Sequence, residues 1–343
     1  MGSLNRIFLP SSLRVWLAVV LVWAAMAVLG CAAAAPEPTS GPEPASSAVE
    51  AVKEPPSPGP ASSGAPTGSR PVNPMAGDGE INPILATTIL NPGEQRVSFL
   101  LVGKKAIIKA SEASVAAIYQ GEGGGSAQET TAVFHGWPFG IRGAYSARIN
   151  FDRPGPWQLK IVVDDGEVSG ETTIDLEVVE QSPVPAIGQR PPLSETKTLA
   201  DVPGVEQLTT DYNADEDLYQ LTVAQAIESP RPAVVVFASP AFCTSATCGP
   251  QVDTVKELKA AFVDRADFVH VEIYDLPDEI QGDLSKASFA PAVDEWGFSS
   301  IPHWFNESWV YILDEEGLVD HRFEGFATLT ELEAALKETL DAG

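Results

Sequence analysis

Short runs in which apolar and polar residues alternate occupy the chain from about residue 82 to residue 180. They include "RVSFLLV", "SVAAIYQ", "WQLKIVV" and "TTIDLEVV". Such alternation is typical of half-buried β-strands, and turn-forming stretches such as "NPGE", "GEGGGS" and "DDGE" separate the runs. Short strands at this spacing predict an all-β sandwich over residues 82–180, with Trp137 and Trp157 in its core.

A different pattern follows a Pro-rich linker at residues 181–198. The run "AVVVFAS" at 233–239 is almost continuously apolar, as expected for a strand that is buried on both faces. After it come the helical pattern "PQVDTVKELKAAFV", the strand "ADFVHVEIYD", the hairpin "WVYILDEEGLVDHRFEGF" and the helix "TLTELEAALKETL". This alternation of strands and helices predicts an α/β domain over residues 199–343.

Two helices of this domain carry a start signal in the sequence. Thr328 and Glu331 have the spacing of a capping box ahead of the last helix, and Thr222 and Gln225 have it ahead of a short earlier helix. We therefore expect each threonine to be the N-cap of its helix.

The first thirty residues have the pattern of a targeting signal. Arg6 and Arg14 precede the apolar run "VWLAVVLVWAAMAVLG", and the run ends at Cys31. The ending "VLGC" resembles a bacterial lipobox, which implies cleavage before Cys31 and lipid attachment to it. The alternatives are an ordinary signal peptide and a single membrane helix. Residues 31–81 are rich in Ala, Pro, Ser and Gly, and predict a disordered tether between a lipid anchor and the folded part.

The charge of the chain limits its partners. The net charge is −26, with a sequence pI near 4.3. A chain this acidic is a poor partner for nucleic acid or for an anionic membrane surface. We expect contact with the membrane only through a lipid anchor, at the outer face of a bacterial cytoplasmic membrane.

Cys243 and Cys248 are the two cysteines that remain if Cys31 is lipidated. They lie in "CTSATCGP", between a predicted strand and the next helix, where helix-terminal N–H groups stabilise a thiolate. A bridge across so short a loop removes little entropy from the unfolded chain, so stabilisation of the fold is a weak explanation for the presence of the two cysteines. A redox pair, a metal site and an inert bridge all remain open.

The spacing of the two cysteines limits where the helix can begin. Residues five apart in an ideal α-helix have Cα atoms about 8.6 Å apart. A disulfide tolerates about 7 Å, so the pair cannot close inside an intact helix. Gly249 and Pro250 favour a helix that begins after Cys248, whereas a helix from Thr244 would have to unwind on oxidation.

The stretches "VVVFASPAFCTSATCGP" and "WVYILDEEGLVDHRFEGF" resemble the thioredoxin superfamily, in particular resolving-type thioredoxins and peroxiredoxins. The resemblance implies a thioredoxin-like domain over 199–343 and a thiol–disulfide oxidoreductase without a cofactor. Cys243 would attack, Cys248 would resolve, and the partners would be extracytoplasmic protein thiols and disulfides. The β-rich region resembles the immunoglobulin-like modules of bacterial surface proteins, which implies a spacer or recognition module.

The same resemblance raises further candidates. Thioredoxin-like proteins keep a cis-proline opposite their cysteines, and its equivalent here is Ser308 when counted back from Gly317, or Pro302 in "WGFSSIP". Copper-delivery proteins of this superfamily suggest a Cu(I) site formed by Cys243, Cys248 and His303.

Two other functions stay as alternatives. One is a non-catalytic surface binding protein in which the cysteines form a structural disulfide. The other is a peroxidase, with Arg322 as the arginine that peroxiredoxins use. The chain departs from the peroxiredoxin pattern ahead of Cys243, where Val236 and Pro240 replace the expected Pro and the expected Thr or Ser.

Overall fold

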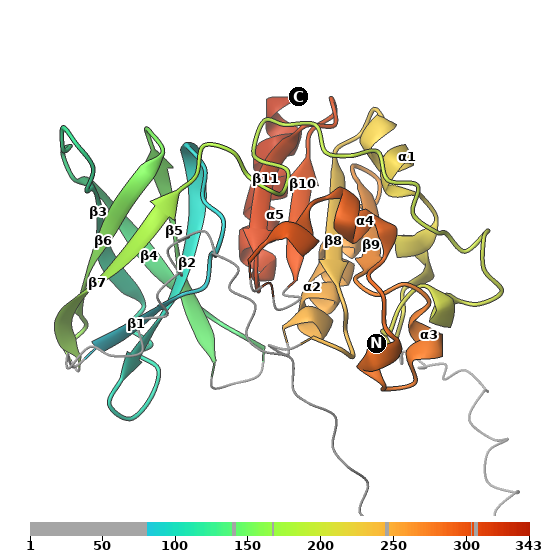
Figure 1. Ribbon diagram of the computed structural model, residues 1–343, viewed down its shortest axis with the longest axis horizontal. Coiled ribbons are helices and arrows are strands. Elements are labelled where there is room, and N and C mark those ends of the chain that lie inside the picture. The colour runs from blue at the N-terminus through green and yellow to red at the C-terminus, as the bar shows by residue number, and fades with distance from the viewer. Residues whose placement is uncertain (1–80, 139–141, 167, 244–246, 303, 305–307) are drawn as a thin grey trace, which may run out of the picture. The chain divides into compact units, whose positions relative to one another are not determined.

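A computed structural model describes residues 81–343 apart from 139–141, 167, 244–246, 303 and 305–307 (Figure 1). The predicted signal peptide, the lipidated Cys31 and the tether up to residue 80 lie outside the described residues. None of the helices in the described part of the chain has the length and apolar character needed to cross a membrane.

The first half of the described chain forms one sheet of seven antiparallel strands in the order β1-β2-β5-β4-β3-β6-β7. The strands are β1 (Ile81–Leu85), β2 (Gly93–Gly103), β3 (Glu112–Tyr119), β4 (Gln128–Gly136), β5 (Gly143–Phe151), β6 (Gly155–Asp164) and β7 (Ser169–Val178).

Alternation of residue type produces the core of this sheet, as β6 illustrates. Trp157, Leu159 and Ile161 are buried, whereas the intervening Lys160 and Val162 are exposed, because successive side chains of a strand point to opposite faces. Trp157 is therefore a core residue, as predicted. Trp137 is only partly buried and does not belong to this core.

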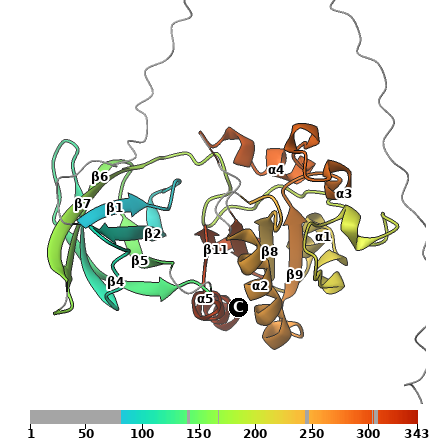
Figure 2. The ribbon, with the colours of Figure 1, turned by 90° about the horizontal axis from the view of Figure 1, so that it is seen from below.

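The two ends of the strand order approach each other, so that the sheet is nearly closed (Figure 2). A Cβ atom placed on Gly170 of β7 would lie only 2.9 Å from Cδ1 of Ile81 in β1. The Val179 amide, just after β7, donates to the Leu90 carbonyl between β1 and β2. The curved sheet encloses one core and abolishes most of its free edge.

The second half forms a four-stranded mixed sheet in the order β11-β10-β8-β9. Its strands are β8 (Ala233–Ala238), β9 (Asp267–Glu272), β10 (Trp309–Leu313) and β11 (Val319–Glu324). β9 runs parallel to β8, and the other two pairings are antiparallel. Every residue of β8 is buried, as the continuous apolar run predicts.

Helices cover both faces of the second sheet (Figure 2). The longer helices α2 (Cys248–Phe262) and α5 (Leu329–Ala342) pack on one face, and α1 (Val223–Glu228) and α4 (Pro291–Glu295) pack on the other. The remaining short helices are α3 (Pro277–Ile280) and the 3-10 turns Val205–Gln207, Glu216–Tyr219, Leu284–Lys286 and Phe298–Ser300. Thr222 and Thr328 form the predicted capping boxes of α1 and α5.

The predicted fold class, an all-β immunoglobulin-like sandwich followed by an α/β thioredoxin-like domain, is wrong. The structure is mostly β. Instead of two facing sheets, the first half is a single sheet that curls on itself, because its strands pair edge to edge around one core. In the second half, two of the three strand pairings are antiparallel, and α1, α3 and α4 have only four to six residues, so no clear α/β thioredoxin domain is formed.

Candidate functional site

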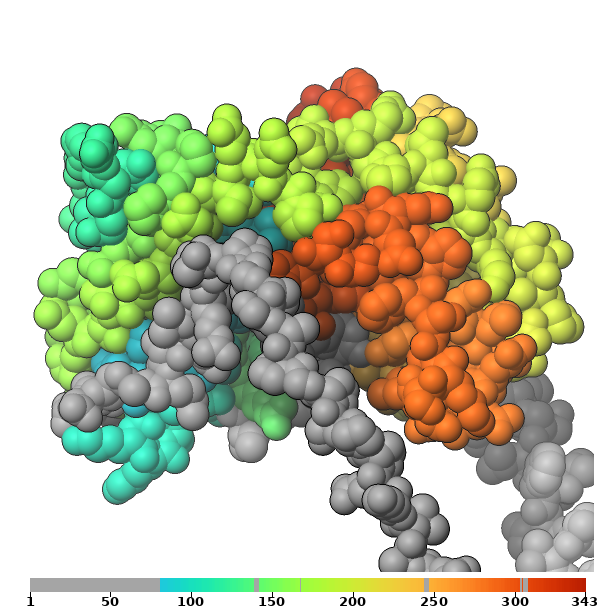
Figure 3. All heavy atoms as spheres, viewed as in Figure 1, coloured from blue at the N-terminus to red at the C-terminus, as the bar shows by residue number. Residues whose placement is uncertain are grey.

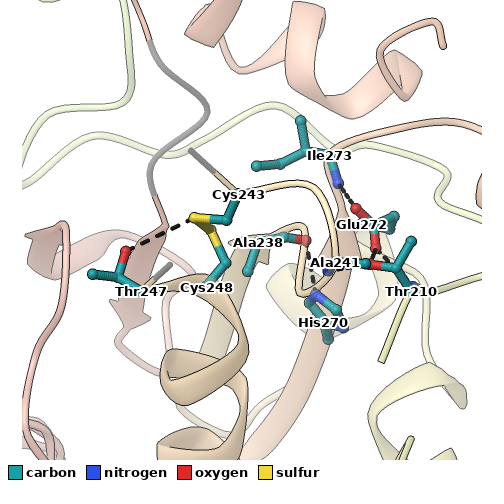
Figure 4. Close-up of a disulfide and its surroundings, with 9 residues drawn as sticks. All are labelled: Thr210, Ala238, Ala241, Cys243, Thr247, Cys248, His270, Glu272 and Ile273. Carbon is teal, nitrogen blue, oxygen red and sulfur yellow. Dashed lines mark hydrogen bonds between the residues drawn. A yellow bond between two sulfur atoms is a disulfide. The ribbon is translucent and has the colours of Figure 1, made fainter. Parts of the chain in front are cut away.

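A disulfide joins Cys243 and Cys248 at the end of β8 (Figure 4). Their Cα atoms are 5.8 Å apart. This distance lies inside the range that a disulfide tolerates and well below the roughly 8.6 Å expected inside a regular helix. The reason is that α2 begins at Cys248, which leaves Cys243 in the preceding loop.

The two sulfur-bearing residues differ in their exposure. Cys248 is fully buried and belongs to the core between the second sheet and α2, where it packs with Val252 and other apolar residues. Cys243 is only partly buried and lies at the margin of the same core. An attacking group from solvent can therefore approach Cys243, whereas the core shields Cys248.

The start of α2 provides an electropositive environment. The helix has fifteen residues, and its first turn carries no acidic side chain. Unpaired N–H groups and the positive end of the helix dipole lower the pKa of a thiol at this position. The Thr247 hydroxyl lies 3.9 Å from the Cys243 sulfur, within reach of a weak hydrogen bond. We expect the Cys243 thiol of the reduced protein to ionise more readily than a free cysteine.

Buried Glu272, at the end of β9, is connected to the cysteine loop (Figure 4). The Thr210 amide and hydroxyl both donate to its Oε2 atom, at 2.9 and 2.8 Å. The Ala241 amide in turn donates to the Thr210 hydroxyl at 3.0 Å. Burial raises the pKa of Glu272 to about 7, against the opposing effect of the hydrogen bonds from Thr210.

This connection was not predicted from the sequence. The one available signal is a glutamate inside an otherwise apolar strand, since a buried carboxyl group needs partners. Thr210 lies 62 residues away, so the sequence offers no sign of the pairing.

His270 is a buried neighbour of the same loop and behaves as a structural residue. Its Nε2 lies 3.1 Å from the Ala238 carbonyl oxygen, which can only accept, so Nε2 carries the proton and donates. Its Nδ1 then accepts from the Tyr219 hydroxyl at 2.7 Å. Burial lowers the pKa of His270 to about 4, so the ring is neutral near pH 7.

The candidates for the cis-proline-equivalent position lie in different places. Trp309 pairs with Phe237, so Ser308 is level with Ala238, at the end of the sheet from which the cysteine loop departs. Ser308 is fully buried, whereas Pro302 is exposed in a turn. The peptide bonds of the described residues are all trans.

Of the predicted copper ligands, the structure places only Cys243 and Cys248, which form the disulfide. Among the described residues, no group of three His, Cys, Asp or Glu side chains is placed to hold a metal ion. His303, the third ligand of the copper alternative, lies outside the described residues. Arg322, the arginine of the peroxidase alternative, is buried in β11 and donates to the carbonyls of Ile89 and Pro185.

Comparison with known proteins adds no family. No protein-family model matches the chain, and a comparison with curated proteins finds no match.

Proposed function

We propose that the chain is a thiol–disulfide oxidoreductase whose Cys243–Cys248 pair exchanges disulfides with other proteins. The Cys243 thiolate attacks one sulfur of a partner disulfide, and the other partner sulfur leaves as a thiolate. The Cys248 thiolate then attacks the Cys243 sulfur, which closes the Cys243–Cys248 bridge and releases the second partner thiolate. The same steps in reverse oxidise a partner dithiol.

One observation carries this proposal: the bridge joins a partly exposed sulfur-bearing residue to a buried one at the start of a long helix. Because only Cys243 is partly exposed, a partner thiolate would attack Cys243, and Cys248 would resolve the mixed disulfide. The thiolate that leaves when the bridge opens lies at the positive end of α2, which stabilises it. The motif's resemblance to the thioredoxin superfamily supports the same activity.

The targeting pattern extends the proposal to location. Lipid attachment at Cys31 would hold the mature protein at the outer face of the cytoplasmic membrane, where its partners would be exported proteins. Labelling cells with a radioactive fatty acid tests this step: we expect label in the wild-type protein and none in Cys31→Ser. Label retained in that variant would contradict lipid attachment at Cys31.

The reduction potential of the pair tests the activity. Equilibration of the purified protein with glutathione buffers should give a value in the range of catalytic dithiols, from about −270 to −120 mV. In addition, Cys248→Ser should accumulate mixed disulfides through Cys243 in cells, and Cys243→Ser should not. A potential below about −300 mV together with no trapped partner would mean that the bridge is an inert structural one.

A further inference from the structure

A row of aromatic rings begins at the residue next to Cys243. The Phe242 ring lies 5.9 Å from Tyr274, Tyr274 lies 5.8 Å from Phe289, and Phe289 lies 5.6 Å from Trp304, measured between ring centroids. We call these four side chains the aromatic row. Tyr274 and Phe289 are also paired by an isolated antiparallel bridge, which fixes the middle of the row.

The aromatic row reaches the surface of the molecule. Phe289 is 40% exposed, which is high for a phenylalanine, and Phe242, Tyr274 and Trp304 are partly exposed. The segment that carries Phe289, between α3 and α4, lies on the molecular surface in the view of Figure 3, where it is orange. An apolar strip beside a reactive sulfur is a surface on which a partner can dock.

A small pocket with acidic walls adjoins the aromatic row at Tyr274. The pocket has a volume of about 120 Å³, and the residues that line it include Tyr274 and the acidic Glu195, Asp275 and Glu295. Lys197 is the one lysine or arginine in this wall, and it is already paired with Asp275. The pocket therefore favours a positively charged side chain, as does the net charge of −26.

We infer that the aromatic row and this pocket bind an extended segment of a partner protein, in which aromatic or aliphatic residues and a lysine or arginine follow a cysteine. The spacing of the rings supports an extended segment. Alternate side chains of a strand lie roughly 6.6 Å apart, close to the separation of neighbouring rings in the row. Aromatic rings also attract cationic side chains through their faces. The partner cysteine would then meet Cys243 at the Phe242 end.

This inference rests on the proposed exchange activity and names its substrate class. The test uses the oxidised full chain and short synthetic peptides with one cysteine. The first peptide has phenylalanine at alternate positions after the cysteine and one arginine. In the second peptide glutamate replaces the arginine, and in the third peptide serine replaces each phenylalanine.

In the assay, the peptide thiolate attacks Cys243 and forms a mixed disulfide, and Cys248 leaves as a thiolate. A second peptide thiol then reduces the mixed disulfide and forms a peptide dimer. The rate of protein reduction is followed by mass spectrometry after acid quenching. Each rate is divided by the rate of the same peptide with oxidised glutathione, which corrects for intrinsic thiol reactivity.

We expect the first peptide to react about five- to tenfold faster than either of the others, with an advantage over the glutamate peptide that shrinks as salt is added. Phe289→Ser should remove most of the advantage over the serine peptide. The matched control Val162→Ser changes another exposed apolar residue, in β6, and should leave all rates unchanged.

The outcomes separate this inference from the proposed function. Equal corrected rates for the three peptides, with normal reduction by dithiothreitol, would overturn the substrate class alone. A bridge that resists the peptides and also resists dithiothreitol in the folded protein would overturn the exchange activity, and the substrate class with it.

Discussion

Thr210 donates two hydrogen bonds to a single oxygen of Glu272 and holds the cysteine loop through the Ala241 amide. The carboxyl group is almost fully buried, and burial raises its pKa to about 7. Protonation of Glu272 near neutral pH therefore changes the charge of a group that is two hydrogen bonds away from the cysteine loop.

The raised pKa of Glu272 predicts a specific dependence of stability on pH. A carboxyl group of ordinary pKa, about 4.5 in the unfolded chain, loses its proton before the folded one does. Between pH 4.5 and 7 the folded protein binds more protons, so this group lowers the free energy of unfolding as pH rises through that window, by about 2 to 3 kcal/mol. When the free energy of unfolding is measured by urea titration at pH 5 and pH 8, Glu272→Gln should not show this decrease.

A second buried carboxyl group, on β11 at the opposite edge of the sheet from β9, serves as the internal reference for that measurement. Burial also raises the pKa of Glu324 to about 7, and its contribution is present in both wild type and Glu272→Gln. It therefore cancels when the two proteins are compared. Equal pH dependence in the two proteins would show that Glu272 has an ordinary pKa in the folded state.

His270 predicts the opposite dependence. Burial lowers its pKa to about 4, whereas an unfolded histidine titrates near 6.5. Between these two values the unfolded chain therefore binds a proton that the folded protein does not bind. As a result, the free energy of unfolding falls as pH drops from 6.5 to 4, by about 3 kcal/mol at most. In His270→Gln this decrease should be absent. The variant should also be about 1 to 3 kcal/mol less stable at pH 7.5, where Tyr219 or Ala238 loses a partner. A decrease of wild-type size in the variant would contradict this account.

The unequal burial of the two cysteines predicts unequal alkylation. After reduction, iodoacetamide should modify Cys243 first, and Cys248 should react at least about tenfold more slowly because it has no exposed surface. The pH at half-maximal rate for Cys243 should fall below the ordinary thiol pKa of about 8.5, because the start of α2 stabilises the thiolate. Peptide mapping by mass spectrometry after timed quenching measures both rates. Similar rates at the two positions would remove the distinction between attacking and resolving sulfur.

Local patterns in the sequence predict most elements of the second sheet. The apolar run at 233–239 becomes β8, the helical pattern at 250–263 becomes α2, and "DEEG" marks the turn between β10 and β11. Each of these signals depends on residues that are close together in the chain. The start of α2 differs by two residues, because the helix takes in Cys248 ahead of Pro250.

Long-range pairing explains what the sequence does not show. The alternation in β2 predicts a strand, but it does not reveal that β2 pairs with β5, or that β7 returns to β1 and nearly closes the sheet. A sandwich and a curled sheet bury the same alternate residues, so the pattern cannot separate them. The contact between Thr210 and Glu272 is hidden for the same reason.

The size of the loop that the disulfide closes predicts a small effect on stability. A bridge between residues five apart restricts the unfolded chain little, and the loop-entropy relation gives about 2 kcal/mol. Reduction of the bridge should lower the free energy of unfolding by no more than this amount in urea titrations with and without dithiothreitol. Cys243→Ala serves as a permanently open control, because it removes the sulfur of the more exposed cysteine and leaves Cys248 in the core. Stability and redox behaviour are linked: the bridge raises the free energy of unfolding by the same amount by which folding makes reduction of the bridge less favourable. A change of about 30 mV in the reduction potential corresponds to 1.4 kcal/mol. A loss well above about 4 kcal/mol would therefore indicate a bridge that is hard to reduce, and would favour a structural disulfide over an exchanging one.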